Sequence, residues 1–130
     1  MFQARPNQIE SPIEEIVRLE LTARGIEFLQ EYQIDRGDFR KYYVDFLLPE
    51  YGEGIIIECD GHEYHSSPPQ KLYDQKRTKY LNSIGYRVIR LTGREIYLDV
   101  IKAIDKVMRI IIEGGEKEEE LINAKKEDLS

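Results

Sequence analysis

Three acidic residues stand at places in this sequence where a charge is unexpected. Asp45 interrupts a segment of aromatic and apolar residues, and Glu58 and Asp60 close the most hydrophobic segment of the chain. An ionised carboxylate inside a sheet is unfavourable unless it is paired or bound to a cation. Residues two apart in a strand face the same way, so Glu58 and Asp60 are expected on one side, with the carbonyl of Cys59 near them. The pattern predicts a divalent metal site formed by Asp45, Glu58, Cys59 and Asp60.

The predicted ligands indicate both the metal and its chemistry. Hard cations such as Mg²⁺, or Mn²⁺ in its place, prefer carboxylate and carbonyl oxygens and water. Such ions act on phosphate esters by lowering the pKa of a bound water and by offsetting charge on the phosphate. Phosphodiester hydrolysis with Mg²⁺ or Mn²⁺ as cofactor is therefore the predicted reaction.

The order of helices and strands predicts a single α/β domain with a mixed β-sheet flanked by helices. A strand–helix–strand crossover makes the strands of Glu58 and Val88 parallel, whereas the first two strands should form a hairpin. The expected elements are a helix over 11–25, strands over 28–34, 42–49 and 55–60, a helix over 71–84, a strand over 86–91 and a helix over 92–112. We therefore expect a domain over residues 11–113, followed by a charged, flexible tail over 114–130.

Composition excludes several classes of protein. Hydrophobic residues make up 41% of the chain and charged residues 34%, a balance typical of globular rather than disordered proteins. One Cys and two His argue against an internal disulfide and against a structural zinc cluster. No apolar run approaches the roughly 20 residues of a membrane span, and the first residues lack the apolar stretch of a signal peptide. We expect a cytoplasmic protein without a membrane partner.

The net charge of −6, taken alone, argues against binding of nucleic acid. Half of it comes from residues 114–130, where six acids stand against three lysines. Local basic segments matter more, because phosphate contacts depend on charge near the site. The two such segments contain Arg36, Arg40 and Lys41, and Lys71, Lys76, Arg77 and Lys79.

A family resemblance appears once these motifs are taken together. From Ser11 to Ile112 their order and spacing resemble the PD-(D/E)XK nucleases, in particular small proteins similar to the very-short-patch repair endonuclease. The residues that carry the resemblance are Asp45, Glu58-Cys59-Asp60-Gly61, His65, Asp74-Gln75-Lys76-Arg77, Leu81, Gly85, Val88 and Arg90.

The resemblance implies a restriction-endonuclease-like fold and a set of roles. Asp45 and Glu58 would bind the metal, the Cys59 carbonyl would assist, and Glu14 would complete the site from a helix. Asp60 stands where the superfamily usually has a lysine. Either Asp60 is a further ligand, or a cation such as Lys76 or Arg77 reaches in from the following helix.

Each candidate also has a simpler explanation. Glu14 completes a capping box that opens at Ser11, and Asp45 could pair with Arg40 or Arg87. Asp60 before Gly61 could make a turn, and His65 could be a polar loop residue rather than a general acid. Asp74 and Arg77 are three apart on the expected helix, so they could form an ordinary ion pair there.

The favoured interpretation is a metal-dependent DNA endonuclease. Glu14, Asp45, Glu58, Asp60 and His65 are its candidate catalytic residues. Its candidate DNA contacts are Arg36, Arg40, Lys76 and Arg77.

Two alternatives stay open. One is a catalytically inactive nuclease-fold module for DNA binding or assembly, supported by the missing lysine, and the other is a nuclease acting on RNA. A homodimer is a further possibility, because Val100, Ile104, Val107 and Ile111 form an apolar stripe along the last expected helix, although such a stripe more often packs in the core.

Overall fold

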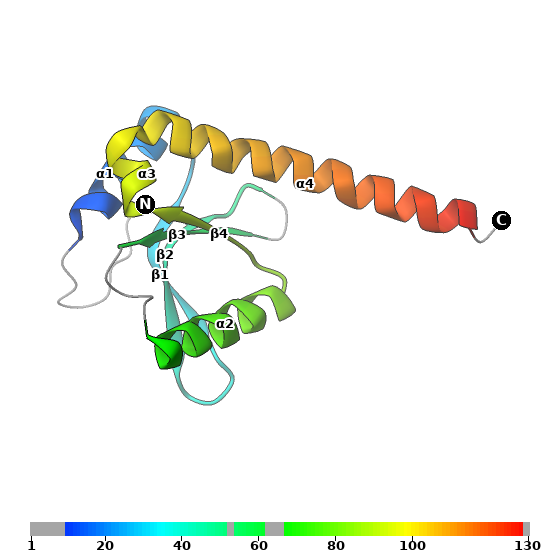
Figure 1. Cartoon of the computed structure of the whole chain (residues 1–130), viewed down its shortest axis with the longest axis horizontal. Helices are drawn as coiled ribbons and strands as arrows, with labels where there is room; N and C mark the ends of the chain where they lie inside the picture. The colour runs from blue at the N-terminus through cyan, green and yellow to red at the C-terminus, as the bar shows by residue number, and fades with distance from the viewer. Residues whose placement is uncertain (1–9, 52–53, 62–66, 129–130) are drawn as a thin grey trace.

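The described residues form four strands and four helices, which follow the expected order except that the last predicted helix is divided in two (Figure 1). The structure is a computed structural model, and it describes residues 10–51, 54–61 and 67–128, with side chains described as far as residue 114. The elements are α1 (Pro12–Ala23), β1 (Leu29–Asp35), β2 (Lys41–Leu48), β3 (Ile55–Asp60), α2 (Pro68–Ser83), β4 (Arg87–Thr92), α3 (Gly93–Leu98) and α4 (Val100–Asp128).

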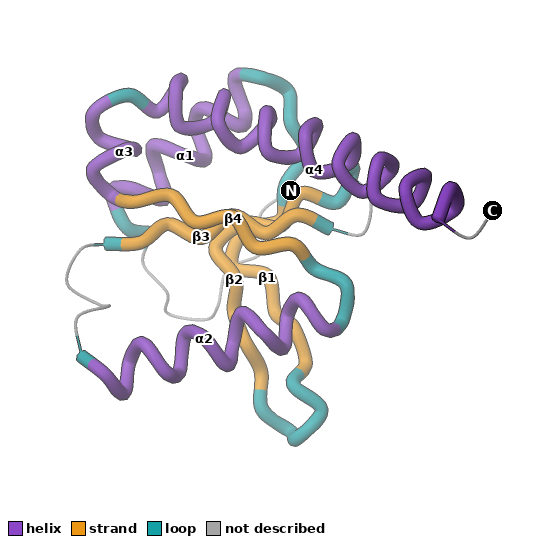
Figure 2. Tube along the Cα trace, turned by 45° about the vertical axis from the view of Figure 1, so that its right-hand side comes forward, coloured by secondary structure: helices purple, strands orange, loops and turns teal. Residues whose placement is uncertain are grey.

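The four strands form one mixed sheet in the order β1-β2-β3-β4. β1 and β2 are an antiparallel hairpin, β3 is antiparallel to β2, and β4 is parallel to β3, with Glu58 opposite Arg90. Helices α1, α3 and α4 cover one face and α2 covers the other (Figure 2). The predicted α/β class and mixed sheet are confirmed.

Each face of the sheet has its own apolar core. On the α1 side, Phe46, Ile57 and Leu91 pack against residues of α1, α3 and α4, and the rings of Phe28 and Phe46 meet edge to face. On the other side Leu81 is the described residue of α2 that is fully buried, and it packs against strand residues such as Val44 and Ile56. Because β3 has apolar residues on both faces, its sequence is a continuous apolar run.

The last predicted helix is divided in the structure. Asp99 adopts an extended conformation and separates α3 from α4. Its carboxylate accepts a hydrogen bond from the backbone N–H of Lys102 at 3.0 Å, which is the N-capping interaction that begins a new helix. A single Asp inside an otherwise helical pattern did not indicate this break.

Helix α4 also extends past the predicted end at Ile112, through both glycines, to Asp128. Gly114 is explained by a close approach, because a Cβ there would lie 2.1 Å from the Arg87 guanidinium, which donates to the Ile110 carbonyl. The flexibility expected for residues 114–130 stays a prediction. In the described part of the chain, no helix is both long and apolar enough to cross a membrane.

Candidate metal centre

Three carboxylates from three elements meet beside the sheet, two of them buried and one half-buried. Glu14 comes from α1, Glu31 from β1 and Asp45 from β2, and one oxygen from each lies within 4.8 Å of the others. Among the described residues, they form a group suited to holding a metal ion, which we call the carboxylate cluster. Carboxylate oxygens at such separations repel one another unless a proton or a cation lies between them.

A distortion of the hairpin brings two of these acids together. The register pairs Gln30 with Phe46 and Tyr32 with Val44, so Glu31 lies across from Asp45, where no regular pair forms. Glu31 has a φ of +50°, which is unusual for a residue with a side chain.

The alternation of faces changes at the same point in both strands. Val44 belongs to the core under α2, yet Phe46, two residues on, belongs to the core under α1. Along the partner segment, Phe28, just before β1, lies on the α1 side, and Ile34 of β1 lies on the α2 side. Glu31 and Asp45 therefore sit at the point where the side chains of the hairpin switch from one face of the sheet to the other, which we call the crossing.

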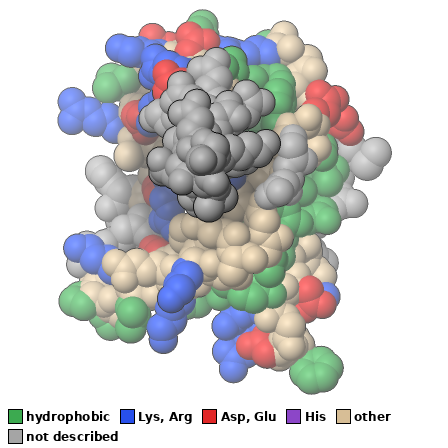
Figure 3. Space-filling view, turned by 90° about the vertical axis from the view of Figure 1, so that its right-hand side faces the viewer, with side chains coloured by type: hydrophobic (Ala, Val, Ile, Leu, Met, Phe, Trp, Pro, Cys, Tyr) green, Lys and Arg blue, Asp and Glu red, His purple; other side chains and the backbone are tan. Residues whose placement is uncertain are grey.

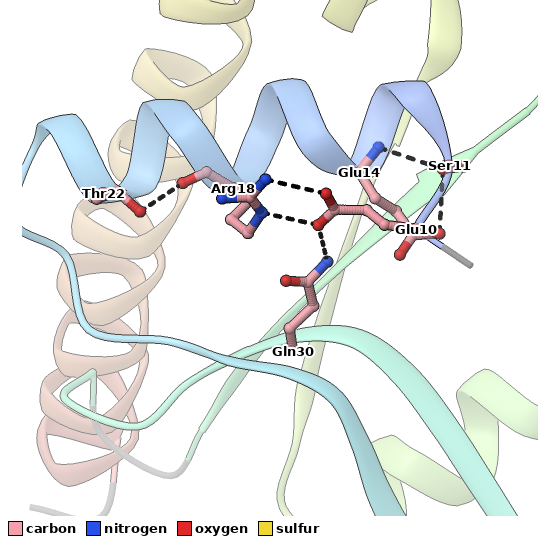
Figure 4. Close-up of polar contacts among 6 residues, drawn as sticks. All are labelled: Glu10, Ser11, Glu14, Arg18, Thr22 and Gln30. Carbon is pink, nitrogen blue, oxygen red and sulfur yellow. Dashed lines mark hydrogen bonds and ion pairs between the residues drawn. The ribbon is translucent and has the colours of Figure 1, made fainter. Parts of the chain in front are cut away.

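The start of α1 is fixed so that Glu14 faces this crossing. Arg18 makes two bonds to the Glu10 carboxylate, at 2.8 and 3.1 Å, and Gln30 of β1 donates to the same carboxylate at 2.6 Å (Figure 4). The Ser11 hydroxyl accepts from the Glu14 N–H at 3.3 Å and lies 3.1 Å from Glu14 Oε1 (Figure 4). Glu14 is thus near the helix cap that the sequence predicted, and it is also in the cluster.

The second carboxylate oxygen of Glu14 indicates a role beyond helix capping. Glu14 is 8% exposed, and its Oε2 has no hydrogen-bond partner among the described residues. An unsatisfied buried oxygen is unfavourable by about 1–3 kcal/mol. The capping role accounts for one oxygen of Glu14 and leaves the other unexplained.

Asp45 is the electrostatic centre of the group. Its Oδ2 accepts from the Cys59 backbone N–H at 2.7 Å. Burial raises the pKa of Asp45 well above its usual range, and the negative charges of Glu58 and Glu14 add to the effect. Neither Arg40 nor Arg87 pairs with it, because Arg40 lies near Asp38 and Arg87 donates to a carbonyl of α4.

Glu58 lies beside Asp45 but is held from the other face of the sheet. Nη2 of Arg77, on α2, is 2.5 Å from Glu58 Oε1 and donates to the Tyr43 carbonyl at 2.8 Å. The Arg77 and Glu58 side chains are 12% and 9% exposed. Of the two cations that the sequence suggested for this role, Arg77 lies at the site and Lys76 is exposed on α2.

Asp60 follows Glu58 on the same side of β3. Its carboxylate is 3.6 Å from Arg90, which also donates to Thr78 of α2. The pKa of the Cys59 thiol is raised, first by burial and then by the charges of Asp45, Glu14, Glu58 and Asp60. The Cys59 thiol therefore lies close enough to all four predicted acids for their negative charges to raise its pKa.

A comparison with protein families places the chain in one of them. A family model described as REase_MTES_1575, of restriction-endonuclease-like proteins, matches residues 13–111, which is more than half of the chain. The chain belongs to this family. The matched range contains the whole carboxylate cluster, and the family indicates a nuclease-type function.

One relative has been matched over a shorter range. A protein of Haemophilus influenzae, titled "Uncharacterized protein", is 39% identical over 70 residues, which is 54% of this chain and 39% of the relative. The match thus spans about two fifths of the relative's length. No solved structure matches the chain.

Four predicted residues are still to be placed, and two of them lie in the β1–β2 turn. Arg36 lies in the β1–β2 turn, 4.6 Å above the Tyr42 ring, and Arg40 is exposed in the same turn. His65 lies outside the described residues. Cys59 contributes its N–H to Asp45, and the structure does not test the predicted role of its carbonyl.

Sequence reasoning missed Glu31. A signal was available, because the turn after Asp35 sets a hairpin register that places residue 31 opposite residue 45. Two acids facing each other across a hairpin are unfavourable without a shared partner. The register would have identified Glu31 as the companion of Asp45.

Proposed function

We propose that this chain is a Mg²⁺- or Mn²⁺-dependent DNA endonuclease that hydrolyses phosphodiester bonds at the carboxylate cluster. The observation that carries the proposal is the convergence of Glu14, Glu31 and Asp45 within 4.8 Å, with Glu14 Oε2 buried and lacking a hydrogen-bond partner among the described residues. Membership of a restriction-endonuclease-like family supports the same conclusion.

The residues fit a hard divalent cation. All three cluster members offer oxygen, the donor that Mg²⁺ and Mn²⁺ prefer. Burial and the negative charges of Glu58 and Glu14 raise the pKa of Asp45, as expected for a carboxylate whose ionised form a bound cation would stabilise. Glu14, Glu31 and Asp45 would hold the ion, with Glu58 as a further ligand on the side of Asp45 and Asp60 beyond it.

When bound, the ion would activate a water molecule and offset charge on the scissile phosphate. Residues of the chain would orient the ion, the water molecule and the phosphate. Arg77 fixes the Glu58 carboxylate and supplies positive charge beside the acids, as expected where Asp60 replaces the usual lysine. Arg36, Arg40 and Lys76 would contact the DNA backbone, and His65 would act as a general acid.

The resemblance to small very-short-patch repair enzymes suggests a role in DNA repair and a break that leaves a 5′-phosphate. A homodimer would allow both strands to be cut.

The test is cleavage of supercoiled plasmid with Mg²⁺ or Mn²⁺, followed as nicked and linear product, with EDTA as the metal-free control. Glu14→Gln and Asp45→Asn should each reduce the rate about a thousandfold, equivalent to about 4 kcal/mol in the barrier. Glu15→Gln is the matched control, because Glu15 is the exposed neighbour of Glu14 on the same helix. Mn²⁺ binding measured by calorimetry should weaken in the first two variants and stay unchanged in the third. Equal rates in all four proteins would refute the assignment of the cluster.

A second candidate is a nuclease-fold module that binds DNA without cutting it. The ion pair between Arg77 and Glu58 favours it, because Glu58 already has a positive partner without a metal. A wild-type protein that binds DNA but leaves plasmid, single-stranded and branched DNA intact with either ion would establish this candidate over the first.

A further inference from the structure

A large open groove begins next to the carboxylate cluster. It has a volume of about 1160 Å³ and crosses the free edge of β4, between α2 on one face of the sheet and the start of α1 and α3 on the other. Ser11, which contacts Glu14, and Asp60, two residues after Glu58, both line it. The groove thus leads away from the proposed site of cleavage.

The groove carries positive charge in a protein whose net charge is −6. Among its described lining residues four are cationic and two acidic, which leaves a local excess of two positive charges. One of the acids, Asp60, is already near Arg90. In an end-on view, Lys and Arg side chains project from the left and lower margins of the molecule (Figure 3). Such a local excess attracts a polyanion even when the whole chain is acidic.

Three of the groove's cations are available for a ligand. Lys71 and Lys79 on α2 and Arg94 on α3 are exposed, and the side chains of these three residues make no hydrogen bond or ion pair with another described residue. They stand on both walls of the groove. A backbone of phosphates passing between the walls would therefore meet cations on each side.

The groove offers an aromatic side chain as well as charges, and this favours one form of DNA. Bases inside a duplex stack on one another and cannot stack on a protein side chain, whereas the bases of a single strand can. Tyr97, 62% exposed on the α3 wall, offers a ring on which a base can stack.

We propose that this groove binds a single strand of DNA leading into the carboxylate cluster, so that the substrate is DNA with an unpaired segment beside the cut. The inference rests on the proposed function for the direction of the strand. Lys71, Lys79 and Arg94 hold its phosphates, and Tyr97 stacks on a base.

The experiment measures binding of the full chain to fluorescein-labelled (dT)₁₅ and to a 15-base-pair duplex, by anisotropy in Ca²⁺ between 50 and 200 mM NaCl. The groove variant is Lys79→Gln with Arg94→Gln. The matched control is Lys102→Gln with Arg109→Gln, which removes the same charge from exposed positions on α4 outside the groove.

Wild type should bind (dT)₁₅ more tightly than the duplex. The groove variant should bind (dT)₁₅ about tenfold more weakly, and the slope of log affinity against log salt should become shallower by about 1.4, corresponding to two lost phosphate contacts. Tyr97→Leu should weaken binding about fivefold or more through lost stacking. The control should match wild type in affinity and slope.

Equal loss in the groove variant and the control, or duplex binding as tight as that of (dT)₁₅, would overturn the inference. Plasmid cutting separates this result from the proposed function. If the groove variant binds like wild type while metal-dependent cutting is lost in Asp45→Asn, the groove inference fails and the nuclease stands. If binding depends on the groove but nothing is cut, the groove stands and the nuclease fails.

Discussion

The two faces of the sheet are built differently. Among the described residues, the face under α1, α3 and α4 buries fourteen apolar residues in its core, and the face under α2 buries six. The smaller core is supplemented by charged and aromatic groups. Both Arg36 and Arg77 lie over the Tyr42 ring, at 4.6 and 5.6 Å.

This difference separates stability from function. The larger core holds the sheet, so α2 is free to present polar and cationic side chains toward the acids at the ends of the strands. The carboxylate cluster lies where the hairpin crosses between the two faces, and it draws Glu14 from one side while Glu58 is held from the other. Changes on the two faces should therefore have different consequences.

The largest expected effect is on the α1 side. Phe46→Ala should lower the free energy of unfolding by about 3–5 kcal/mol, because the ring is fully buried and packs edge to face with Phe28. Leu81→Ala, under α2, should cost about 2–3 kcal/mol, near the low end for a buried Leu, because the smaller core relaxes more easily. Urea denaturation monitored by circular dichroism measures both. The exposed Leu72→Ala is the control, and a larger loss for Leu81 than for Phe46 would reverse the comparison.

Next comes the ion pair that crosses from α2 to the acids. Arg77→Gln should lower the free energy of unfolding by about 2–3 kcal/mol, because it removes the cation that pairs with the buried Glu58 carboxylate and the donor to the Tyr43 carbonyl. The free energy of unfolding of Arg77→Lys should lie between those of wild type and Arg77→Gln, since Lys keeps the charge but not the planar guanidinium. Lys76→Gln, at the adjacent exposed position, serves as the reference in the same urea series. A loss no greater than that of Lys76→Gln would mean that Arg77 does not stabilise Glu58.

Much of the fold was predictable because its signals are local. The Ile55–Asp60 strand has the same bounds in the structure as in the sequence prediction, since a continuous apolar run marks a strand buried on both faces. The capping residues at Ser11 and Thr92 also placed the starts of two helices. Asp99 was missed, because an N-cap residue inside a helical pattern resembles an exposed helical Asp.

The site was predictable only in part, because it depends on which residues meet in space. Asp45 was identified from a charge among apolar neighbours, whereas Glu31 lies in a more polar strand and gave no comparable contrast. Sequence reasoning proposed either Lys76 or Arg77 beside the acids. The choice depends on the rotation of α2 about its axis, which the weak amphipathicity of that helix does not determine.

A smaller change in the free energy of unfolding, and one of opposite sign, is expected for a substitution in the carboxylate cluster. Burial and the charges of Glu58 and Glu14 raise the pKa of Asp45, so the folded state without metal favours its protonated form. Relative to the unfolded chain, this preference stabilises the fold below the usual pKa of an Asp. The stabilisation is lost as pH rises through the pKa that Asp45 has in the folded state. Asp45→Asn should therefore increase the free energy of unfolding at pH 8 in EDTA by about 1 kcal/mol, with no gain at pH 4. A variant less stable than wild type at pH 8 would show that Asp45 stabilises the metal-free fold.

The smallest effect belongs to a carboxylate on the α1 side that has a cation partner. A hydrogen bond from Lys106, and then the Thr92 backbone N–H, holds the pKa of Glu95 below its usual range. Its contribution is therefore present above the usual pKa of a Glu and is lost as pH falls through the folded-state value, the reverse of Asp45. Because the Glu95 side chain is 36% exposed, the contribution should be less than about 1 kcal/mol. Glu95→Gln should be slightly less stable than wild type at pH 7 and equal to it at pH 3 in thermal melts. Glu95→Gln and Asp45→Asn should therefore change the free energy of unfolding in opposite directions as pH rises. A change in the same direction would show that the cation partner of Glu95 is not what distinguishes it from Asp45.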